Sequence, residues 1–382
     1  MPVSDYIFKI STAIYIISLA LPFFSNVPLI VLSLGGLGAV FFVQDKKLFS
    51  SPVTGFLSLF VLSFLISSVF SRDLEKTLAL SPSLLPGLIL FFLIVEFYDR
   101  QKFYWIFGCF GAASALVSII ALYTAVVSGR PTPSDWVAES GLPYFIVPND
   151  FMLLAVFIPF FMFIVLRQKQ FTFRAAAMII IALDLSVFTV FRSRGAILLS
   201  LAAVGLPWVL LTRSYKKIVL TLLTGIAVVV MIDFFTGFQL AHKLAAGSGS
   251  WLTRLAPWSA AWEIFKSSPL IGTGPRTFGR FYPQMPWTHS LYLETLAEQG
   301  LLGITALAGL IISMGQALRK PMAEDDIAVV LFVSGLILFL GGIIEFSFVR
   351  HLFVIVFFVI VSLTIGVSLP PSGASRMDSY SS

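Results

Sequence analysis

Residues 251–303 bring together side chains of the types that proton transfer and phosphate binding use. The stretch contains His289 and the arginines Arg254, Arg276 and Arg280, and apolar runs flank it on both sides. Histidine as a residue type changes its charge near neutral pH, and the planar fork of arginine suits phosphate oxygens. Ionisable side chains at the border of a membrane helix are usually functional. We therefore predict a functional site in this stretch.

His289 stands where the polar stretch meets the next apolar run. Thr288 precedes it and suits a helix N-cap. On a helix that began there, Tyr292 would share a face with His289, whereas Glu294, five residues on, would point elsewhere. A lone histidine at a helix start is more often structural, and the neighbouring arginines are what favour a functional interpretation. We expect the partner of His289 to come from another helix.

A second cationic site is predicted upstream, where Arg192 and Arg194 occupy a tight turn between two apolar runs. Arg194 precedes Gly195, which allows close backbone approach, and stands near the start of the next helix, where anions are favoured. The turn therefore suits a phosphate or diphosphate. Snorkelling of the side chain to the membrane interface is the alternative, and it suits Arg192 well.

The glycine-rich segment at residues 272–279 resembles a phosphate-binding loop only loosely. It lacks the Lys-Ser/Thr pair of a nucleotide-binding P-loop. We reject nucleotide binding there, and expect the glycines to form a sharp turn.

Several acidic or polar positions have two interpretations each. Asp73 and Glu75 resemble a metal-binding pair, but Arg72 and Lys76 flank them, which favours a local ion-paired turn. We therefore predict no metal and no cofactor. Asp184 lies within an apolar run, where an acid is a functional candidate that an arginine would pair. Asn149 and Asp150 open an apolar run, and we interpret them first as an N-cap. The second interpretation is a polar contact in an outer cavity.

The elements that must position these side chains are membrane helices. The chain has 382 residues, of which 58% are hydrophobic and 12% charged, against about 25% charged in soluble domains. A helical span needs about 20 mostly apolar residues. We predict an all-α polytopic bundle of about twelve transmembrane helices, forming one domain over residues 1–369. The runs are 6–24, 28–43, 53–70, 78–97, 103–127, 148–166, 173–190, 195–212, 218–236, 289–313, 326–346 and 350–369.

Lysine and arginine are enriched in alternate short loops, which places those loops and both termini in the cytoplasm. Two longer outer loops follow, at about 128–147 and 237–288, and the tail at 370–382 is predicted to be disordered. In the larger outer loop, Trp251, Leu255, Trp258 and Trp262 share one helical face. This spacing predicts a short helix lying at the membrane surface, with Arg254 near that face.

These motifs together resemble the O-antigen ligase and O-antigen polymerase superfamily of bacterial membrane glycosyltransferases. The resemblance covers about residues 145–365 and is most specific over 190–303. The segments that carry it are HSLYLETLAEQGLLG at 289–303, SRGA at 193–196, the Arg254, Trp258 and Trp262 run, and PLIGTG at 269–274.

The resemblance implies an inverting, metal-independent glycosyltransferase on the periplasmic face of the bacterial inner membrane. The donor would be a glycan on undecaprenyl diphosphate. At the matching positions, Arg194 and Arg254 would bind the diphosphate, and His289 would be the general base near the acceptor. Location adds three further substrate-binding candidates, Arg276, Arg280 and Arg350. Tyr292 and Trp258 complete the predicted substrate-binding residues.

Three functions stay open. A ligase, which we favour slightly, would transfer the glycan to a sugar hydroxyl of lipid A–core in lipopolysaccharide assembly. A polymerase would join undecaprenyl-diphosphate-linked repeat units of a cell-surface polysaccharide. A transporter or lipid flippase is the rival from another class, but the chain shows no repeated halves of the kind that transporters often have. The sequence identifies neither the glycan, the acceptor nor the oligomeric state.

Overall fold

A computed structural model describes most of the chain, and every described element is a helix. The described residues are 3–18, 51–78, 81–128, 133–140, 148–191, 193–212, 223, 226–227, 230, 249–346, 348 and 350–369. In chain order the elements are α1 (Val3–Ser18), α3 (Pro52–Val69), α4 (Leu74–Leu78), α5 (Ser81–Phe97), α6 (Arg100–Val127), α7 (Pro133–Ser140), η2 (Pro148–Val156), α8 (Ile158–Arg167), α9 (Phe171–Val190), α10 (Arg194–Thr212), α13 (Gly249–Ser267), α14 (Phe278–Phe281), α15 (Leu291–Arg319), η3 (Pro321–Ala323), α16 (Asp326–Ile344) and α17 (His351–Ser368).

The predicted all-α polytopic membrane bundle is confirmed. Among the described residues, 8 helices are long and apolar enough to cross a membrane, and two shorter apolar helices accompany them at Phe8–Ile17 and Leu84–Glu96. These correspond to ten of the twelve predicted spans. The other two, 28–43 and 218–236, lie outside the described residues.

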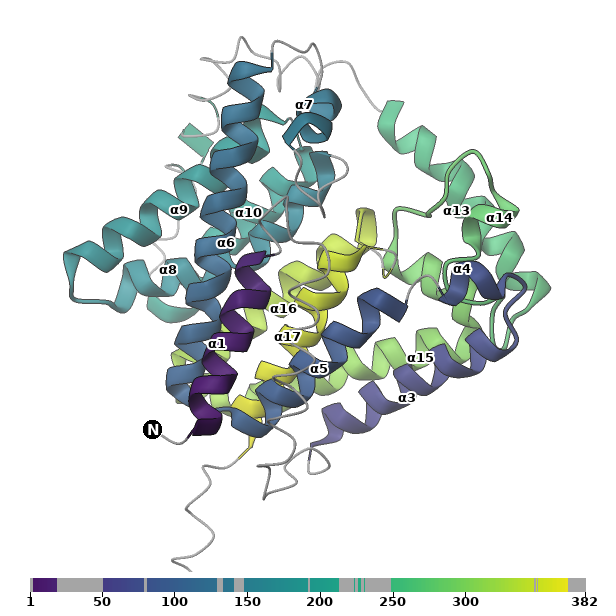
Figure 1. The fold of residues 1–382 in the computed structure, drawn as a ribbon, viewed down its shortest axis with the longest axis horizontal. Coiled ribbons are helices and arrows are strands. Elements are labelled where there is room, and N and C mark those ends of the chain that lie inside the picture. Colours follow the sequence, from purple (N-terminus) through teal and green to yellow (C-terminus); the bar gives the residue numbers. More distant parts are fainter. Residues whose placement is uncertain are drawn as a thin grey trace, which may run out of the picture.

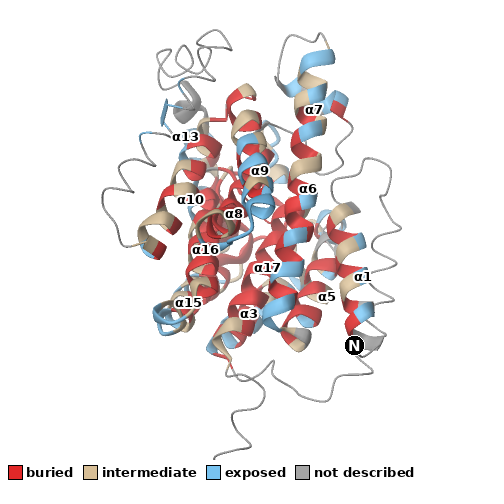
Figure 2. Ribbon diagram, turned by 90° about the vertical axis from the view of Figure 1, so that its left-hand side faces the viewer, coloured by how far each residue is buried: buried red, intermediate tan, exposed pale blue. Residues whose placement is uncertain are grey.

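Helices α16 and α17 form the centre of the bundle (Figures 1 and 2). Buried residues make up 83% of the α17 window and 72% of the α16 window, so neither helix has a broad face left for lipid. Around them, α5 packs along α17, α10 packs along α16, and α3 runs beside α15. The end of α16 and the start of α17 are therefore enclosed by other elements of the bundle.

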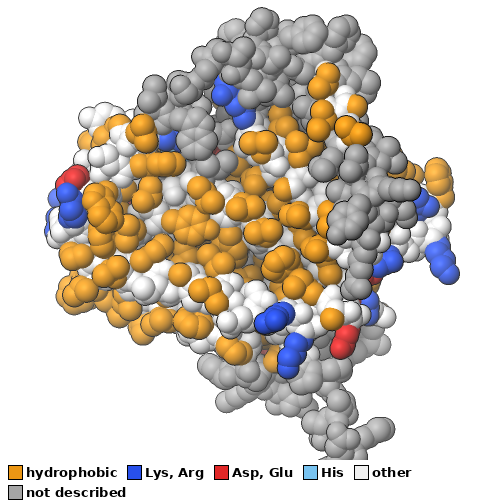
Figure 3. Space-filling view, turned by 180° about the vertical axis from the view of Figure 1, so that it is seen from behind, with side chains coloured by type: hydrophobic (Ala, Val, Ile, Leu, Met, Phe, Trp, Pro, Cys, Tyr) orange, Lys and Arg blue, Asp and Glu red, His pale blue; other side chains and the backbone are white. Residues whose placement is uncertain are grey.

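The outer surface has the character expected of a lipid-facing protein. The view from behind shows a broad face covered by hydrophobic side chains, with Lys and Arg gathered at its margins (Figure 3). Exposed apolar side chains such as Leu65, Ile119 and Ile179 come from different helices. In water such a surface would be unfavourable, whereas in lipid it is the normal solvent boundary.

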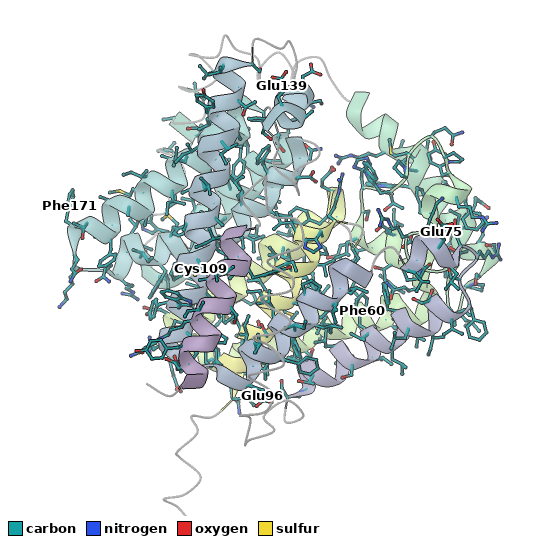
Figure 4. All side chains as sticks on the ribbon, viewed as in Figure 1. Phe60, Glu75, Glu96, Cys109, Glu139 and Phe171 are labelled. Carbon is teal, nitrogen blue, oxygen red and sulfur yellow. The ribbon has the colours of Figure 1, made fainter. Side chains whose placement is uncertain are left out.

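Ion pairs between separate helices gather at one end of the bundle. At one end, Lys102 Nζ lies 3.1 Å from Asp5 Oδ1, Arg100 Nη2 lies 3.2 Å from Asp325 Oδ1, and Arg167 Nε lies 2.7 Å from Asp326 Oδ2. The start of α1 and the end of α17 both lie on this side (Figure 1). Glu96 lies at this end and Glu139 at the opposite one (Figure 4).

Helix α15 is broken near its start, and the break organises the loop before it. Gly300 has φ 64° and ψ −158°, which interrupts the helical hydrogen bonds. The loop after α13 pairs with the freed groups: Leu301 N donates to Pro269 O at 2.8 Å, and Gly274 N donates to Glu298 O at 3.0 Å. Buried backbone groups that lose their helical hydrogen bonds must find such partners. The PLIGTG motif and the Gln-Gly of the α15 motif are thus two halves of one structural unit.

The predicted glycine turn and the predicted ion-paired turn are both present. Gly272 and Gly274 have φ of 70° and 107°, in the region that favours glycine. Asp73 accepts a hydrogen bond from Lys76 N at 3.2 Å, and the two side chains lie 3.6 Å apart. Asp73 thus caps the short helix α4 and pairs within its own turn.

One expectation about a buried acid needs correction. Asp184 is buried, but its carboxylate accepts hydrogen bonds from Ser114 and Ser118 at 2.7–2.9 Å instead of pairing with an arginine. The predicted short helix in the outer loop is present as α13, and the spacing of Leu255, Trp258 and Trp262 places them on one face of it. Leu255 and Trp262 on this face are exposed, whereas Trp258 donates a hydrogen bond to Thr288 O. The side chain of Trp251 lies outside the described residues.

Candidate active site

Glu345 is the centre of a polar cluster at one end of the bundle. It caps the C-terminus of α16, and its side chain is only 4% exposed. Nδ1 of His289 lies 3.0 Å from its Oε1, and Nη2 of Arg254 donates to its Oε2 at 3.0 Å. A buried carboxylate is stable only with such partners. Two residues predicted to be catalytic therefore meet at an acid that the prediction did not name.

His289 is held in an unusual backbone conformation. Its φ is 56°, a left-handed value that is uncommon for any residue but glycine and often marks a functional site. The hydroxyl of Thr288 holds the turn, because it donates to Ser290 O at 2.7 Å and accepts from Ser290 N at 3.0 Å. The N-cap of α15 is Ser290, so the expectation that Thr288 caps a helix containing His289 is wrong.

The second ring nitrogen of His289 faces Trp287. The indole Nε1 donates a hydrogen bond to His289 Nε2 at 3.1 Å. An indole nitrogen is only a donor, so Nε2 carries a lone pair and Nδ1 carries the proton that is donated to Glu345. The arrangement thus defines the tautomer in which Nε2 accepts a proton. The partner orients the ring as the carboxylate does in a catalytic triad.

Arg350 lies over the ring of Trp287. Its Cζ is 4.4 Å from the centroid of the Trp287 ring, a cation–π distance. Its Nε lies 3.5 Å from Oδ1 of the buried Asp150. Its buried Nη2 has no hydrogen-bond partner in the described part of the chain. Arg350 therefore contacts Trp287, the neighbour of His289, and its position is held by Asp150 of η2.

Arg194 is linked to the cluster through two neighbours. Nδ2 of Asn149 donates to Glu345 Oε2 at 3.1 Å, and Ser193 Oγ donates to Asn149 Oδ1 at 3.2 Å. Arg194 directly follows Ser193 and begins α10, as predicted. The structure therefore brings Arg194, Arg254 and His289 from three separate elements to one region, with Glu345 and Asn149 between them.

The remaining predicted residues have different surroundings. Trp258 Nε1 donates to Thr288 O at 3.1 Å, which fastens α13 to the turn of His289. The Tyr292 hydroxyl donates to Phe339 O at 2.9 Å and joins α15 to α16. Arg280 donates to the carbonyl of Arg72, and the backbone N of Arg276 donates to Glu298 at 2.7 Å. These contacts place Arg276 and Arg280 at the turn after the glycine loop, beside the α3–α4 connection. Arg192 lies outside the described residues.

Glu345 carried a signal in the sequence. It is an acid at the end of the apolar run 326–346, where an ionisable residue is a functional candidate by default. The same rule selected Asp184, which turned out to bind two serines within the bundle. The sequence contained no means of ranking these two acids, because the distance from each to His289 depends on how the helices pack.

The fold and the site define a class, a polytopic membrane protein with a His–Glu–Arg cluster at one end of its helices. A comparison with known protein families agrees with this class. Residues 185–308 match the family model described as O-antigen ligase. This match confirms the resemblance to the O-antigen ligase and polymerase superfamily. It includes Arg194, Arg254 and His289 and stops before Glu345 and Arg350. No match was found among curated proteins.

Proposed function

We propose that this protein is an O-antigen ligase that transfers a glycan from undecaprenyl diphosphate to a sugar hydroxyl of lipid A–core. The observation that carries the proposal is the contact of His289 and Arg254 with one buried carboxylate. This cluster lies within and beside the region that matches the family model. In this proposal the cluster faces the periplasm. The opposite end of the bundle, where Arg100 pairs with Asp325 and Arg167 with Asp326, faces the cytoplasm.

His289 acts as the general base in this mechanism. The acceptor hydroxyl gives its proton to Nε2 as its oxygen bonds to the anomeric carbon of the donor glycan. Glu345 stabilises the imidazolium that forms, because it accepts the hydrogen bond from Nδ1. A positioned general base contributes about 10²–10⁴-fold to a rate. Attack opposite the leaving group inverts the configuration at that carbon.

The leaving diphosphate gains negative charge as the glycosidic bond breaks. Arginines fixed by the protein stabilise such charge without reorganisation. Arg254 is oriented by Glu345, and Arg194 stands at the N-terminus of α10, where the helix dipole also favours an anion. The buried Nη2 of Arg350 is a further donor suited to a polar atom of a substrate. The mechanism therefore assigns no step to a metal ion.

A transfer assay with purified protein tests the proposal. Undecaprenyl-diphosphate glycan and lipid A–core are supplied in detergent or liposomes with EDTA, and new glycosidic bonds are measured. We expect transfer by the wild type and a loss of at least about 100-fold in His289→Gln. His351→Gln is the matched control, since His351 contacts Tyr15 at 3.4 Å and not Glu345. Equal turnover in a folded His289→Gln protein would disprove the role of the base.

A polymerase that joins lipid-linked repeat units is the alternative within the same superfamily. Deletion of the gene separates the two. Loss of polymer on lipid A–core while long lipid-linked polymer remains supports the ligase. Single repeat units still attached to the core support the polymerase. Movement of labelled lipid across sealed vesicles without new glycosidic bonds would instead support a flippase.

A further inference from the structure

Trp287 occupies the position at which the proposed base must act. Its Nε1 lies 3.1 Å from Nε2 of His289, and a general base must lie about 2.6–3.2 Å from the atom whose proton it takes. Nδ1 is engaged by Glu345, so Nε2 is the ring nitrogen that remains for the acceptor. The indole and an acceptor hydroxyl cannot both use the one lone pair of Nε2.

We propose that Trp287 caps His289 until an acceptor sugar displaces it, and that the cap suppresses transfer of the glycan to water. The inference rests on the proposed function, because it concerns the base of that reaction. Trp287 is a positioning and gating residue here, since it acts on the substrate's access to His289.

The cap is held by defined contacts. Arg350 stacks over the indole at 4.4 Å, and Asp150 holds Arg350 at 3.5 Å. The rings of Trp287 and His289 meet edge to face, with centroids 5.8 Å apart. A single hydrogen bond of ordinary strength is worth about 0.5–1.5 kcal/mol, which an incoming ligand can offset with its own contacts. A water molecule could replace only this one hydrogen bond, whereas a sugar makes further contacts that offset the loss of the indole.

The chemistry explains why such a cap is useful. In transfer, the acceptor oxygen bonds to the anomeric carbon, the bond from that carbon to the diphosphate oxygen breaks, and the hydroxyl proton moves to Nε2. The electron pair of the broken bond leaves with undecaprenyl diphosphate. Water can replace the acceptor in every step, and the product is then free glycan. A base that is exposed only when an acceptor is present limits this loss.

The reactivity of His289 tests the cap without any need for turnover. Diethyl pyrocarbonate acylates an unprotonated imidazole nitrogen, and mass spectrometry of peptides measures the modification of His289 separately from His351. Trp287→Phe keeps the ring and removes the N–H. We expect His289 in this variant to be modified about two- to thirteenfold faster than in the wild type, which is the range that one hydrogen bond controls. We also expect donor hydrolysis without acceptor to rise by a similar factor.

Trp105→Phe is the matched control, because it also removes an indole N–H that donates a hydrogen bond. Trp105 Nε1 donates to Lys9 O on α1 at 3.1 Å, away from His289. Its His289 should react as in the wild type. Arg350→Gln is a second variant, which leaves the indole but removes its clamp, and it should also raise the modification rate. A folded Trp287→Phe protein whose His289 reacts at the wild-type rate overturns the cap.

The two proposals fail in different ways. If the wild type transfers glycan but the modification rates are equal, the cap is wrong and the transferase stands. If the modification rates differ as expected but no glycosidic bond forms, Trp287 does shield His289, but the transferase is wrong and with it the role of the cap against hydrolysis.

Discussion

His289 and Glu345 are 56 positions apart in the sequence, and Nδ1 of one lies 3.0 Å from Oε1 of the other. Their elements meet because α15 and α16 pack against each other. The contact sets the tautomer of the histidine, and Arg254 and Asn149 hold the far oxygen of the same carboxylate.

Glu345→Gln should nearly abolish transfer. A glutamine amide can donate to Nδ1, which would move the ring proton to Nε2 and remove the lone pair that accepts the proton of the hydroxyl. Loss of the correct tautomer costs about 10⁴-fold in a Ser-His-Asp triad, so we expect at least about 100-fold here. The measurement is the transfer rate of protein whose thermal stability has been checked. Glu263→Gln is the control, because Glu263 pairs with Lys266 on the exposed side of α13.

Asn149→Asp should be more harmful than Asn149→Ala. The alanine variant removes the donor that lies 3.1 Å from Glu345 and the acceptor of Ser193 Oγ, and it adds no charge. The aspartate variant adds a like charge at that distance, which is worth several kcal/mol at the effective dielectric constant of a protein. We expect at least about a tenfold lower rate than for the alanine variant at neutral pH. The ratio of the two rates should approach one as the pH falls, because protonation of the introduced carboxyl removes the repulsion. A constant ratio across pH would contradict this explanation.

Gly300→Ala should destabilise the protein. The backbone at Gly300, with φ 64° and ψ −158°, is accessible essentially to glycine alone. An added Cβ would lie 2.5 Å from Leu270 C and 2.7 Å from Gly272 N. We expect a loss of about 3 kcal/mol, seen as a lower melting temperature in detergent. Gly315→Ala is the control on the same helix, since nothing lies within 4 Å of its added Cβ. It should be neutral or slightly stabilising.

Asp184→Asn should leave transfer within about a factor of three of the wild type. The asparagine keeps an oxygen that can accept from Ser114 or Ser118, and the pair of serines lies on α6, within the bundle. The test compares transfer rate and melting temperature in one preparation. A folded variant that has lost transfer would return Asp184 to the catalytic candidates.

Features that depend on a single segment of the chain could be predicted from the sequence. The apolar runs predicted the helices because length and hydropathy are properties of each segment alone. The start of α10 at Arg194 and the glycine turn at Gly272 and Gly274 were likewise local. The break at Gly300 was not predicted, because an isolated glycine in an apolar run is compatible with an unbroken helix.

The sequence by itself determined the class of protein and the helical spans. It also supplied the three candidate catalytic residues, His289, Arg194 and Arg254, through the resemblance to the superfamily. Tertiary structure alone decided which acid serves His289, that Trp287 covers its second nitrogen, and that Asn149 and Ser193 connect Arg194 to Glu345. The physical reason is that helical periodicity relates residues only a few positions apart. A hydrogen bond between residues 56 positions apart depends on how whole helices pack, and sequence spacing carries no measure of that distance.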